Sequence, residues 1–341
     1  MKRFLKSLYL PARRLVLSPF RRRAEPFVPA GPIRSILVLR PDRIGDMVQT
    51  TPMLAALKKE FPGSRITVLA SAANGAVLDG NPDADRVVLE PPIAESFDLL
   101  IDPYWEYDLE WIWIARKVRA RYKLGFDIWG RAIFYNLRVP GLLPGLSASE
   151  AMLDLCRRGL GRPFPDEKPR IFLLPGQREK GRKLLQEAGA GLGKPLVLLH
   201  PGGHYEFKRW PAGNFGKLAA ALEREGACEA LVTGGPADEP LLREAKNAGA
   251  RTLAAADLRS WICLLPHAAL LICNNSGPMH VACALGVRTL CAVGPEADDY
   301  LWRPRGPLHQ VLEADPLGSL TVAAMLDRAR AVLEEMSGKE A

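Results

Sequence analysis

The sequence predicts an α/β protein of two domains, each built on a parallel β-sheet. Length is the first indication, because 341 residues exceed what one hydrophobic core usually supports, and hydrophobic residues make up 48% of the chain. The second is an alternation, in both halves, of short apolar runs with longer helix-like segments. Because parallel strands need long crossover connections, this alternation favours parallel sheets covered by helices.

Each half of the chain contains five runs that are typical of buried strands. In the first half these runs are Ile33–Leu39, Arg65–Leu69, Arg86–Leu89, Phe97–Asp102 and Tyr122–Phe126. In the second half they are Leu196–His200, Glu229–Thr233, Thr252–Ala254, Leu270–Cys273 and Thr289–Val293. We expect the domain boundary within Pro175–Pro195, where several glycines lie close together, which gives domains over residues 31–180 and 190–318.

The stretch Leu270–Gly286 has the pattern of a strand, a turn and a helix that together bind an anion. The apolar run ends at two asparagines, and the turn Asn275–Ser276–Gly277 opens a helix with Pro278 in its first turn and His280 close behind. Unpaired N–H groups and the positive end of the helix dipole meet at such a point, which suits a diphosphate. Taken alone, the pattern fits an ordinary capped helix equally well.

A similar pattern occurs at Ile36–Pro52, where a strand leads into a turn and then a helix that runs to about Glu60. Gly45 permits a tight turn, and Asp46 lies at the head of the helix. Its carboxylate has two interpretations: it stabilises its own helix by about 0.3–1 kcal/mol, or it is a general base that accepts a proton from a substrate hydroxyl.

The third stretch is Val197–Trp210, where a strand ends in a Pro-Gly-Gly loop. The backbone N–H groups of Gly202 and Gly203 can cradle a phosphate. Lys208 and Arg209 follow, and they either neutralise a departing diphosphate or form a solvated basic pair.

In their order along the chain, these stretches resemble glycosyltransferase family 9, the heptosyltransferases of bacterial lipopolysaccharide core assembly. The motifs that carry the resemblance are Gly45-Asp46 with Thr51-Pro52, His200-Pro201-Gly202 with Lys208 and Trp210-Pro211, Thr233-Gly234-Gly235-Pro236 with Glu239, Asn275-Ser276-Gly277-Pro278-Met279-His280, and Gly294-Pro295. The resemblance implies a GT-B fold, in which two Rossmann-like domains face a central cleft. A final helix within residues 319–341 would pack back on the N-terminal domain.

The resemblance also implies a reaction and its residues. Heptose would pass from ADP-heptose to a lipid A-linked core acceptor with inversion, without an obligatory metal and without a cofactor. Asp46 would be the catalytic base, and Lys208 would stabilise the departing diphosphate. The remaining donor-binding residues would be Gly202, Gly203, Glu239, Asn275, Ser276, Gly277 and His280, with Glu239 on the ribose.

One departure from the family pattern concerns Asn275, where many relatives carry Asp. Asparagine keeps the hydrogen-bonding shape but removes the charge. This leaves open a relative that uses another nucleotide sugar or another glycan acceptor, or a catalytically silent membrane-associated relative. A nicotinamide oxidoreductase is disfavoured, because the first strand leads into Arg-Pro-Asp-Arg-Ile-Gly-Asp rather than a Gly-x-Gly-x-x-Gly fingerprint.

Residues 1–30 form a basic amphipathic arm ahead of the first strand. Lys and Arg alternate there with apolar residues. The apolar runs are too short to span a bilayer, and Pro11 and Pro19 break them. We interpret the arm as an interfacial segment on anionic lipid, with a disordered tail as the alternative. The net charge of +8 suits a phosphorylated glycolipid, although by itself it suits nucleic acid equally well. We therefore expect a cytoplasmic enzyme, peripheral on the inner face of the cytoplasmic membrane, with no nucleic-acid partner.

The six cysteines have neither a zinc-ligand spacing nor a Cys-x-x-Cys pair. They are predicted to be reduced core residues of a cytosolic protein.

Overall fold

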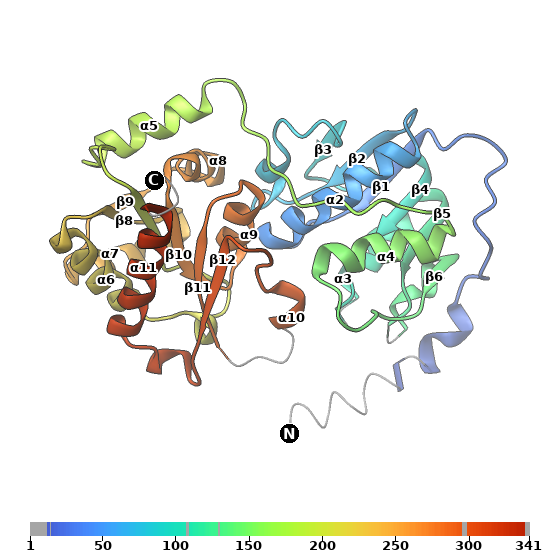
Figure 1. Ribbon diagram of the computed structural model, residues 1–341. Helices are drawn as coiled ribbons and strands as arrows, with labels where there is room; N and C mark the ends of the chain where they lie inside the picture. Colours follow the sequence, from blue (N-terminus) through green and yellow to red (C-terminus); the bar gives the residue numbers. More distant parts are fainter. Residues whose placement is uncertain (1–11, 14, 107–108, 129, 295–298, 338–341) are drawn as a thin grey trace. The chain divides into compact units, whose positions relative to one another are not determined.

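The structure is a computed structural model that describes residues 12–13, 15–106, 109–128, 130–294 and 299–337 (Figure 1). The chain divides into two compact units, Met1–Pro169 and Arg170–Ala341. This boundary precedes the segment in which we expected it, because α5 (Gln177–Glu187) already packs within the second unit. A Cβ added to Gly181 of this helix would lie 1.8 Å from the carbonyl oxygen of Cys263.

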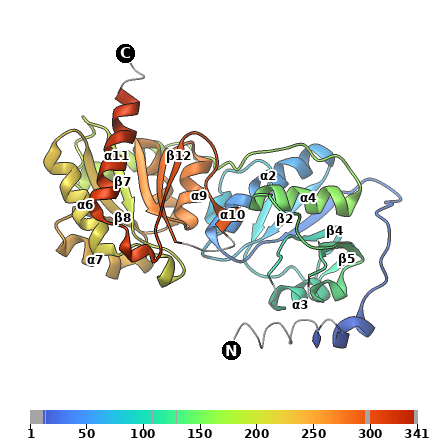
Figure 2. The same cartoon turned by 60° about the horizontal axis from the view of Figure 1, so that its bottom comes forward.

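The first unit contains a six-stranded parallel sheet in the order β3-β2-β1-β4-β5-β6. Its strands are β1 (Ser35–Leu39), β2 (Arg65–Leu69), β3 (Arg86–Val88), β4 (Ser96–Asp102), β5 (Arg119–Phe126) and β6 (Leu137–Val139). Its α-helices are α2 (Ile44–Glu60), α3 (Glu110–Lys117) and α4 (Ala148–Leu160), with short 3₁₀ helices η1 (Ser18–Phe20), η2 (Gly75–Leu78) and η3 (Arg131–Phe134). Figure 2 shows α2 and α4 on one face of the sheet and α3 on the other.

The second unit contains a parallel sheet in the order β12-β11-β10-β7-β8-β9. Its strands are β7 (Leu196–His200), β8 (Glu229–Gly234), β9 (Thr252–Ala254), β10 (Leu270–Asn274), β11 (Thr289–Val293) and β12 (His309–Glu313). Besides α5, its helices are α6 (Ala212–Glu225), α7 (Glu239–Asn247), α8 (Leu258–Ile262), α9 (Gly277–Ala284), α10 (Asp299–Trp302) and α11 (Val322–Ser337), with η4 (Glu206–Lys208), η5 (Pro236–Asp238), η6 (Leu265–His267) and η7 (Leu317–Ser319).

Both sheets have the doubly wound strand order of a Rossmann fold. In each, the direction of winding reverses between two neighbouring strands, β1 and β4 in the first sheet and β7 and β10 in the second. Ligands of such folds bind beyond the carboxyl ends of the strands at this switch point. The topology therefore marks the loops after these four strands as the places to look for a site.

The sequence predicted ten of the twelve strands that the structure describes but missed the last strand of each sheet. These are β6 and β12, which lie at the edges of their sheets. The edge strands β3 and β9 were nevertheless predicted, so the difference lies in composition: β6 is Leu-Arg-Val, with a charged residue in its middle, and β12 is His-Gln-Val-Leu-Glu, with polar residues at both ends. β6 has only three residues, and every residue of β12 keeps some solvent exposure.

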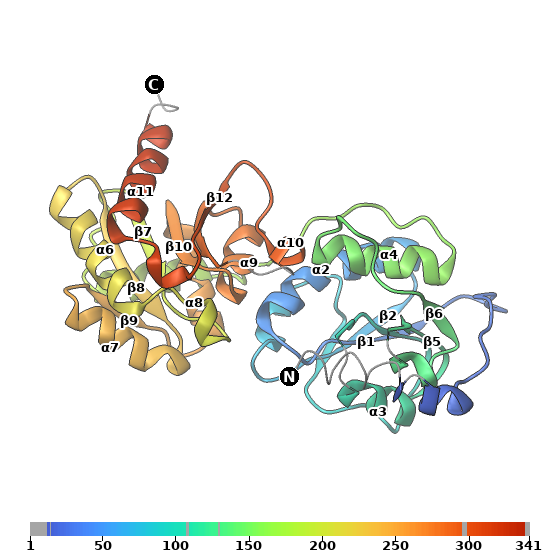
Figure 3. The same cartoon turned by 90° about the horizontal axis from the view of Figure 1, so that it is seen from below.

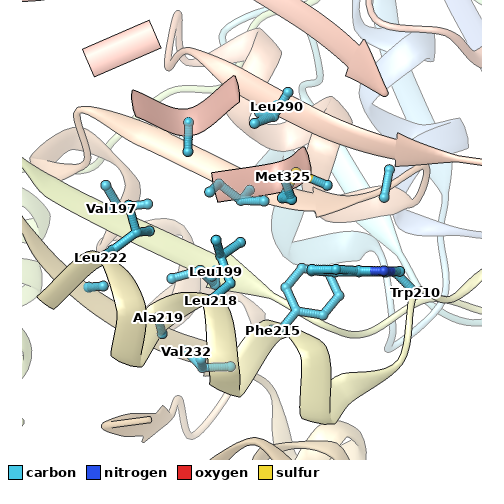
Figure 4. Close-up of a cluster of buried hydrophobic side chains, with 14 of the residues drawn as sticks. Val197, Leu199, Trp210, Phe215, Leu218, Ala219, Leu222, Val232, Leu290 and Met325 are labelled. Carbon is cyan, nitrogen blue, oxygen red and sulfur yellow. The ribbon is translucent and has the colours of Figure 1, made fainter. Parts of the chain in front are cut away.

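The expectation that the final helix returns to the N-terminal domain is wrong. Figure 3 shows α11 beside α6 on one face of the second sheet, with α9 on the opposite face. Met325, Ala329 and Val332 form a stripe along α11 that is buried in the core of this unit, together with Leu218 and Leu222 of α6 (Figure 4). Arg330 also forms an ion pair with Glu225 of α6, with its Nε donating to Oε2 at 3.0 Å. The apolar stripe of α11 is thus covered within its own unit.

The described part of the N-terminal arm docks on the first unit. Leu17 packs on the core that α3 covers, and the N–H of Arg22 donates to the carbonyl oxygen of Ile133 at 2.7 Å. The Tyr122 hydroxyl donates to the carbonyl oxygen of Val28 at 2.7 Å, beside the ring of Phe27. Residues 1–11, which carry most of the predicted amphipathic pattern, lie outside the described residues.

All six cysteines are free thiols, as the sequence predicted. Within the part of the chain that the structure covers, no helix has the length and apolar character needed to cross a membrane.

The packing of α11 gives a stability prediction. Met325→Ala should lower the free energy of unfolding by about 2–5 kcal/mol, because it removes a fully buried side chain and leaves a cavity. Arg328→Ala on the exposed side of the same helix is the control and should change it by no more than about 0.5 kcal/mol. Urea unfolding measures both values. Equal, small effects would contradict the burial of α11 against α6.

Candidate active site

The loop after β1 places Asp46 at the switch point of the first sheet. Arg40 directly follows β1 and is only 1% exposed, and its Nη2 donates to Oδ1 of Asp46 at 2.6 Å. Asp46 lies in the first turn of α2, where the helix dipole also favours a negative charge. The buried guanidinium of Arg40 thus holds Asp46 in one orientation at the start of α2.

Three further contacts fix Arg40 itself. The side-chain amide of Asn74 donates to the Arg40 carbonyl oxygen at 2.9 Å, and the guanidinium carbon lies 6.0 Å from the ring centroid of Trp105. The third contact is to Asp42, whose Oδ2 lies 3.2 Å from Arg40 Nη2. Burial raises the pKa of Asp42 to about 7; nearby Arg40 opposes this shift, and nearby Asp46 adds to it. Sequence reasoning missed both Arg40 and Asp42.

A second buried network lies at the end of β4, next to β1 in the sheet. Asp102 accepts hydrogen bonds from Arg131 Nη2 at 2.5 Å, from the Tyr135 hydroxyl, and from the N–H of Tyr104 at 3.1 Å. Burial, with the nearby Asp102 charge, raises the pKa of Tyr135 well above its usual value, so this hydroxyl remains a donor. The network anchors the start of the loop that carries Trp105.

Two tryptophans in the segment after β4 make packing contacts within the first unit. Trp105 contacts the edge of Phe126 at a centroid distance of 6.2 Å. Trp113 packs on Phe134 at 5.5 Å but remains about half exposed.

In the second unit, Asn274 joins the loops after β7 and β10. Its side chain is fully buried at the end of β10; Nδ2 donates to the carbonyl oxygen of Pro201 at 2.8 Å, and Oδ1 accepts from the N–H of Trp210 at 2.9 Å. Ser276 Oγ lies 3.4 Å from the carbonyl oxygen of Gly202. These bonds hold the glycine loop against the N-terminus of α9.

The structure therefore brings together Gly202, Gly203, Ser276 and Gly277, as the sequence predicted. A Cβ added to Gly203 would lie 3.7 Å from the Cβ of Ser276, so the two loops are in close contact. Ser276 is the N-cap of α9, and Gly277 and Pro278 begin its first turn. The N-terminus of α9 thus lies beside a glycine loop, and a helix N-terminus next to such a loop can bind phosphate.

The glycine loop is supported by His200 and Asp238, to which sequence reasoning gave no role. The N–H of Gly202 donates to His200 Nδ1 at 3.1 Å, so the ring proton is on Nε2, which lies 3.5 Å from Asp238 Oδ2. The N–H of Gly235 also donates to Asp238 Oδ2, at 2.9 Å. Burial opposes ionisation of Asp238, but these hydrogen bonds outweigh it and lower its pKa.

Gly202 must be glycine at this position for steric reasons. A Cβ there would lie 2.3 Å from Asp238 Oδ1 and 2.6 Å from His200 Cε1.

The remaining predicted residues occupy different surroundings. Lys208 ends η4, with its Nζ 5.7 Å from the ring centroid of Tyr205. Arg209, rather than Lys208, closes the glycine loop, because its Nε donates to the Gly203 carbonyl oxygen at 2.7 Å. The side chain of Glu239 is 55% exposed and pairs with Arg243 of its own helix at 2.6 Å.

His280 and Asn275 belong to the strand and helix framework around the loop. His280 is buried beside Trp302, with a centroid distance of 5.8 Å, and burial lowers its pKa to about 4. The imidazole is therefore neutral at physiological pH, which suits a role in orienting the loop. The backbone N–H of Asn275 donates to Ala292 of the neighbouring strand at 3.3 Å.

The sequence pattern of glycosyltransferase family 9 (heptosyltransferase) matches residues 94–316, well over half of the chain. The chain belongs to this family. Lipopolysaccharide heptosyltransferase 3 of Escherichia coli is 27% identical over 287 residues, which cover 76% of this chain and 83% of that protein. The chain is accordingly a glycosyltransferase enzyme.

Solved structures support the fold. The structure of E. coli ADP-heptose lps heptosyltransferase II has a TM-score of 0.74 at 19% identity, covering 89% of this chain and 100% of that chain. The structure of an E. coli heptosyltransferase with ADP has a TM-score of 0.68 at 18% identity, and the match covers 87% of this chain and 99% of that chain. The predicted fold class, two α/β domains of the GT-B type, is confirmed.

Asp238 gives a pH-dependent stability prediction. Since its pKa is lowered in the folded state, its charge stabilises the fold above its unfolded pKa of about 4, and that contribution is lost as pH falls through the folded value. Asp238→Asn should therefore lower the free energy of unfolding by about 1–3 kcal/mol at pH 6 and by much less at pH 2.5.

Denaturant unfolding at several pH values would test this, with the exposed Asp166→Asn as control. A difference that does not shrink on acidification would contradict the ionised role of Asp238.

Proposed function

We propose that this enzyme transfers heptose from ADP-heptose to a lipid A-linked lipopolysaccharide core acceptor with inversion, and that Asp46 is the general base. The observation that carries the proposal is the Asp46 carboxylate, fixed by buried Arg40 at the switch point of the first sheet. Similarity to heptosyltransferases, among them an ADP-heptose enzyme and one solved with ADP, supports the donor.

The reaction needs a base on one side of the anomeric carbon and an anion site on the other. Because Arg40 binds Oδ1 of Asp46, we assign Oδ2 to accept the proton of the acceptor hydroxyl. That hydroxyl oxygen forms the new bond to the anomeric carbon, while the bond from this carbon to the diphosphate oxygen breaks. ADP leaves with the electron pair, and attack from the opposite face inverts the configuration.

The diphosphate would bind where Gly202, Gly203, Ser276 and Gly277 converge, with Lys208 neutralising the charge that develops on the leaving oxygen. Donors that are already in place need no reorganisation in the transition state, and such electrostatics is usually the largest catalytic contribution. With these fixed groups meeting the charge, we propose that no metal or cofactor is required.

The other donor contacts rest on the family resemblance. Glu239 would bind the ribose after releasing Arg243, which an exposed ion pair permits at little cost. His280 and Asn275 would hold the loop that binds the donor.

The acceptor we propose is an anionic glycolipid at the inner face of the cytoplasmic membrane. The net charge of +8 and the exposed Arg22 and Arg23 favour attraction to such a surface. The enzyme would then be cytoplasmic and peripheral, with the arm at residues 1–30 next to lipid and no nucleic-acid partner.

Asn275 favours a second candidate function, in which the enzyme uses a different donor or acceptor. An amide in place of the family's Asp changes the charge next to the donor loop, so a relative that uses another nucleotide sugar or another glycan acceptor stays open. A catalytically silent, membrane-associated relative is the remaining alternative.

Asp46→Asn tests the base. This variant should lower kcat by about 10²–10⁴-fold, because general-base catalysis contributes that much, while ADP binding stays within a factor of two or so of the wild type. Transfer kinetics with ADP-heptose and a lipid A-core acceptor, together with calorimetry, measure both quantities. Unchanged turnover would rule Asp46 out as the base.

Donor selectivity is tested by calorimetry with ADP, UDP and GDP. We expect selective binding of ADP, weakened about 10- to 100-fold in Lys208→Ala, since a hydrogen bond to a charged group is worth about 1.5–3 kcal/mol. The exposed Lys217→Ala on α6 is the matched control and should bind like the wild type. Preference for UDP or GDP would change the sugar assignment, and no binding of any nucleotide would favour the silent relative.

A further inference from the structure

Two carboxylates in the loop after β1 share one guanidinium. Arg40 Nη2 lies 2.6 Å from Oδ1 of Asp46 and 3.2 Å from Oδ2 of Asp42. Asp42 was not among the predicted site residues, and the proposed mechanism gives it no task. Its place beside the proposed base therefore calls for an explanation.

The side chain of Asp42 is only 12% exposed, yet it lacks the hydrogen bonds that a largely buried carboxylate normally makes. Neither of its side-chain oxygens has a hydrogen-bond partner among the residues that the structure describes, although Oδ2 lies close to Arg40. If Asp42 and Asp46 were both ionised, one buried cation would face two anions. Desolvating an excess charge is costly, so one of the two carboxyls tends to keep its proton.

The other groups around Asp42 do not remove this imbalance. Arg43 belongs to the same loop, but its side chain is 41% exposed, and its Nη1 is 4.0 Å from Glu106, so water and that carboxylate weaken its field. From the sheet and its loops, Asn74 and Trp105 contact Arg40, and both are neutral. Arg40 and Asp46 are thus the main charges that act on Asp42.

We propose that Asp42 is a positioning residue that sets the basicity of Asp46 through the Arg40 they share. While Asp42 is protonated, Arg40 pairs with Asp46 alone and makes it a weak base. When Asp42 loses its proton, it competes for Arg40 and adds a negative charge beside Asp46. The affinity of Asp46 for the acceptor proton then rises.

The direction of the pH dependence follows from this arrangement. Burial brings the pKa of Asp42 to about 7, so the change in charge falls within the physiological range. Activity should increase as pH rises through that value. Two carboxyls that interact this closely titrate as a pair, so each should also shift the titration of the other.

The first test is a pH profile of transfer, which rests on the proposed role of Asp46. In the wild type, kcat should rise about 3- to 10-fold between pH 6 and pH 8.5, since an interaction of one pK unit changes proton affinity tenfold. Asp42→Asn should be nearly flat over this range, with KM almost unchanged. Asp154→Asn is the control and should keep the wild-type profile, because Asp154 is a buried acid that pairs with Arg158 on α4.

A wild-type midpoint retained in Asp42→Asn would overturn the proposal. Circular dichroism of each variant would establish that the fold is intact before the profiles are compared.

The second test needs no substrate. In protein labelled with ¹³C at aspartate carboxyls, the signal missing from Asp42→Asn identifies Asp42, which should titrate near pH 7. In Asp46→Asn this midpoint should fall by about one unit or more, because a neighbouring like charge is removed. An unmoved midpoint would overturn the coupling of the two carboxyls.

The two hypotheses can be separated. If Asp46→Asn remains active, the proposed base fails, and the proposed control of its basicity fails with it, even where the carboxyls are coupled. If Asp46→Asn is inactive but Asp42→Asn keeps the wild-type profile, only the role of Asp42 fails.

Discussion

The site depends on one constraint: polar groups buried where strands end at the switch points must find partners. Arg40 follows β1, Asp102 ends β4, His200 ends β7 and Asn274 ends β10, and all four are buried. Burying a neutral polar group there without a hydrogen bond would destabilise the fold by about 1–3 kcal/mol, and burying an unpaired charge would destabilise it more. Their partners come from loops at the carboxyl ends of the strands, so satisfying them also fixes the loop conformations.

The two units meet this constraint with different chemistry. In the first, the partners are ions: Arg40 pairs with Asp46 and Asp42, and Arg131 pairs with Asp102. In the second, neutral groups predominate around Asn274, whose amide bonds only to backbone atoms of the neighbouring loops. A charged network suits proton transfer, whereas oriented N–H dipoles suit an anionic ligand. The proposed division of labour between base and donor site follows this difference.

The sequence predicts a strand or a site residue where a local pattern of residues marks it, and it fails where a residue matters only through contacts made on folding. The buried inner strands are apolar on both faces and were found, as were the edge strands β3 and β9, whereas β6 and β12 contain polar residues and carry too weak a pattern. Gly202, Ser276 and Gly277 came from local motifs, and the structure brings them together. Asp42 and Asp238 could not be found in this way, because their importance lies in contacts with Arg40 and His200 that only the folded loops create. The placement of α11 likewise depends on tertiary packing, because its apolar stripe does not itself specify that α6 covers it.

The replacement of the family's Asp by Asn275 is best understood through Lys208. A carboxylate near this lysine would hold it by an ion pair and cancel part of its charge. In this chain the Nζ of Lys208 lies over the ring of Tyr205, and such a cation–π contact orients an ammonium group without neutralising it. The loop geometry itself is held by Asn274 rather than by residue 275. The departure from the family pattern therefore leaves the donor loop intact, because the bonds that support this loop are made by Asn274.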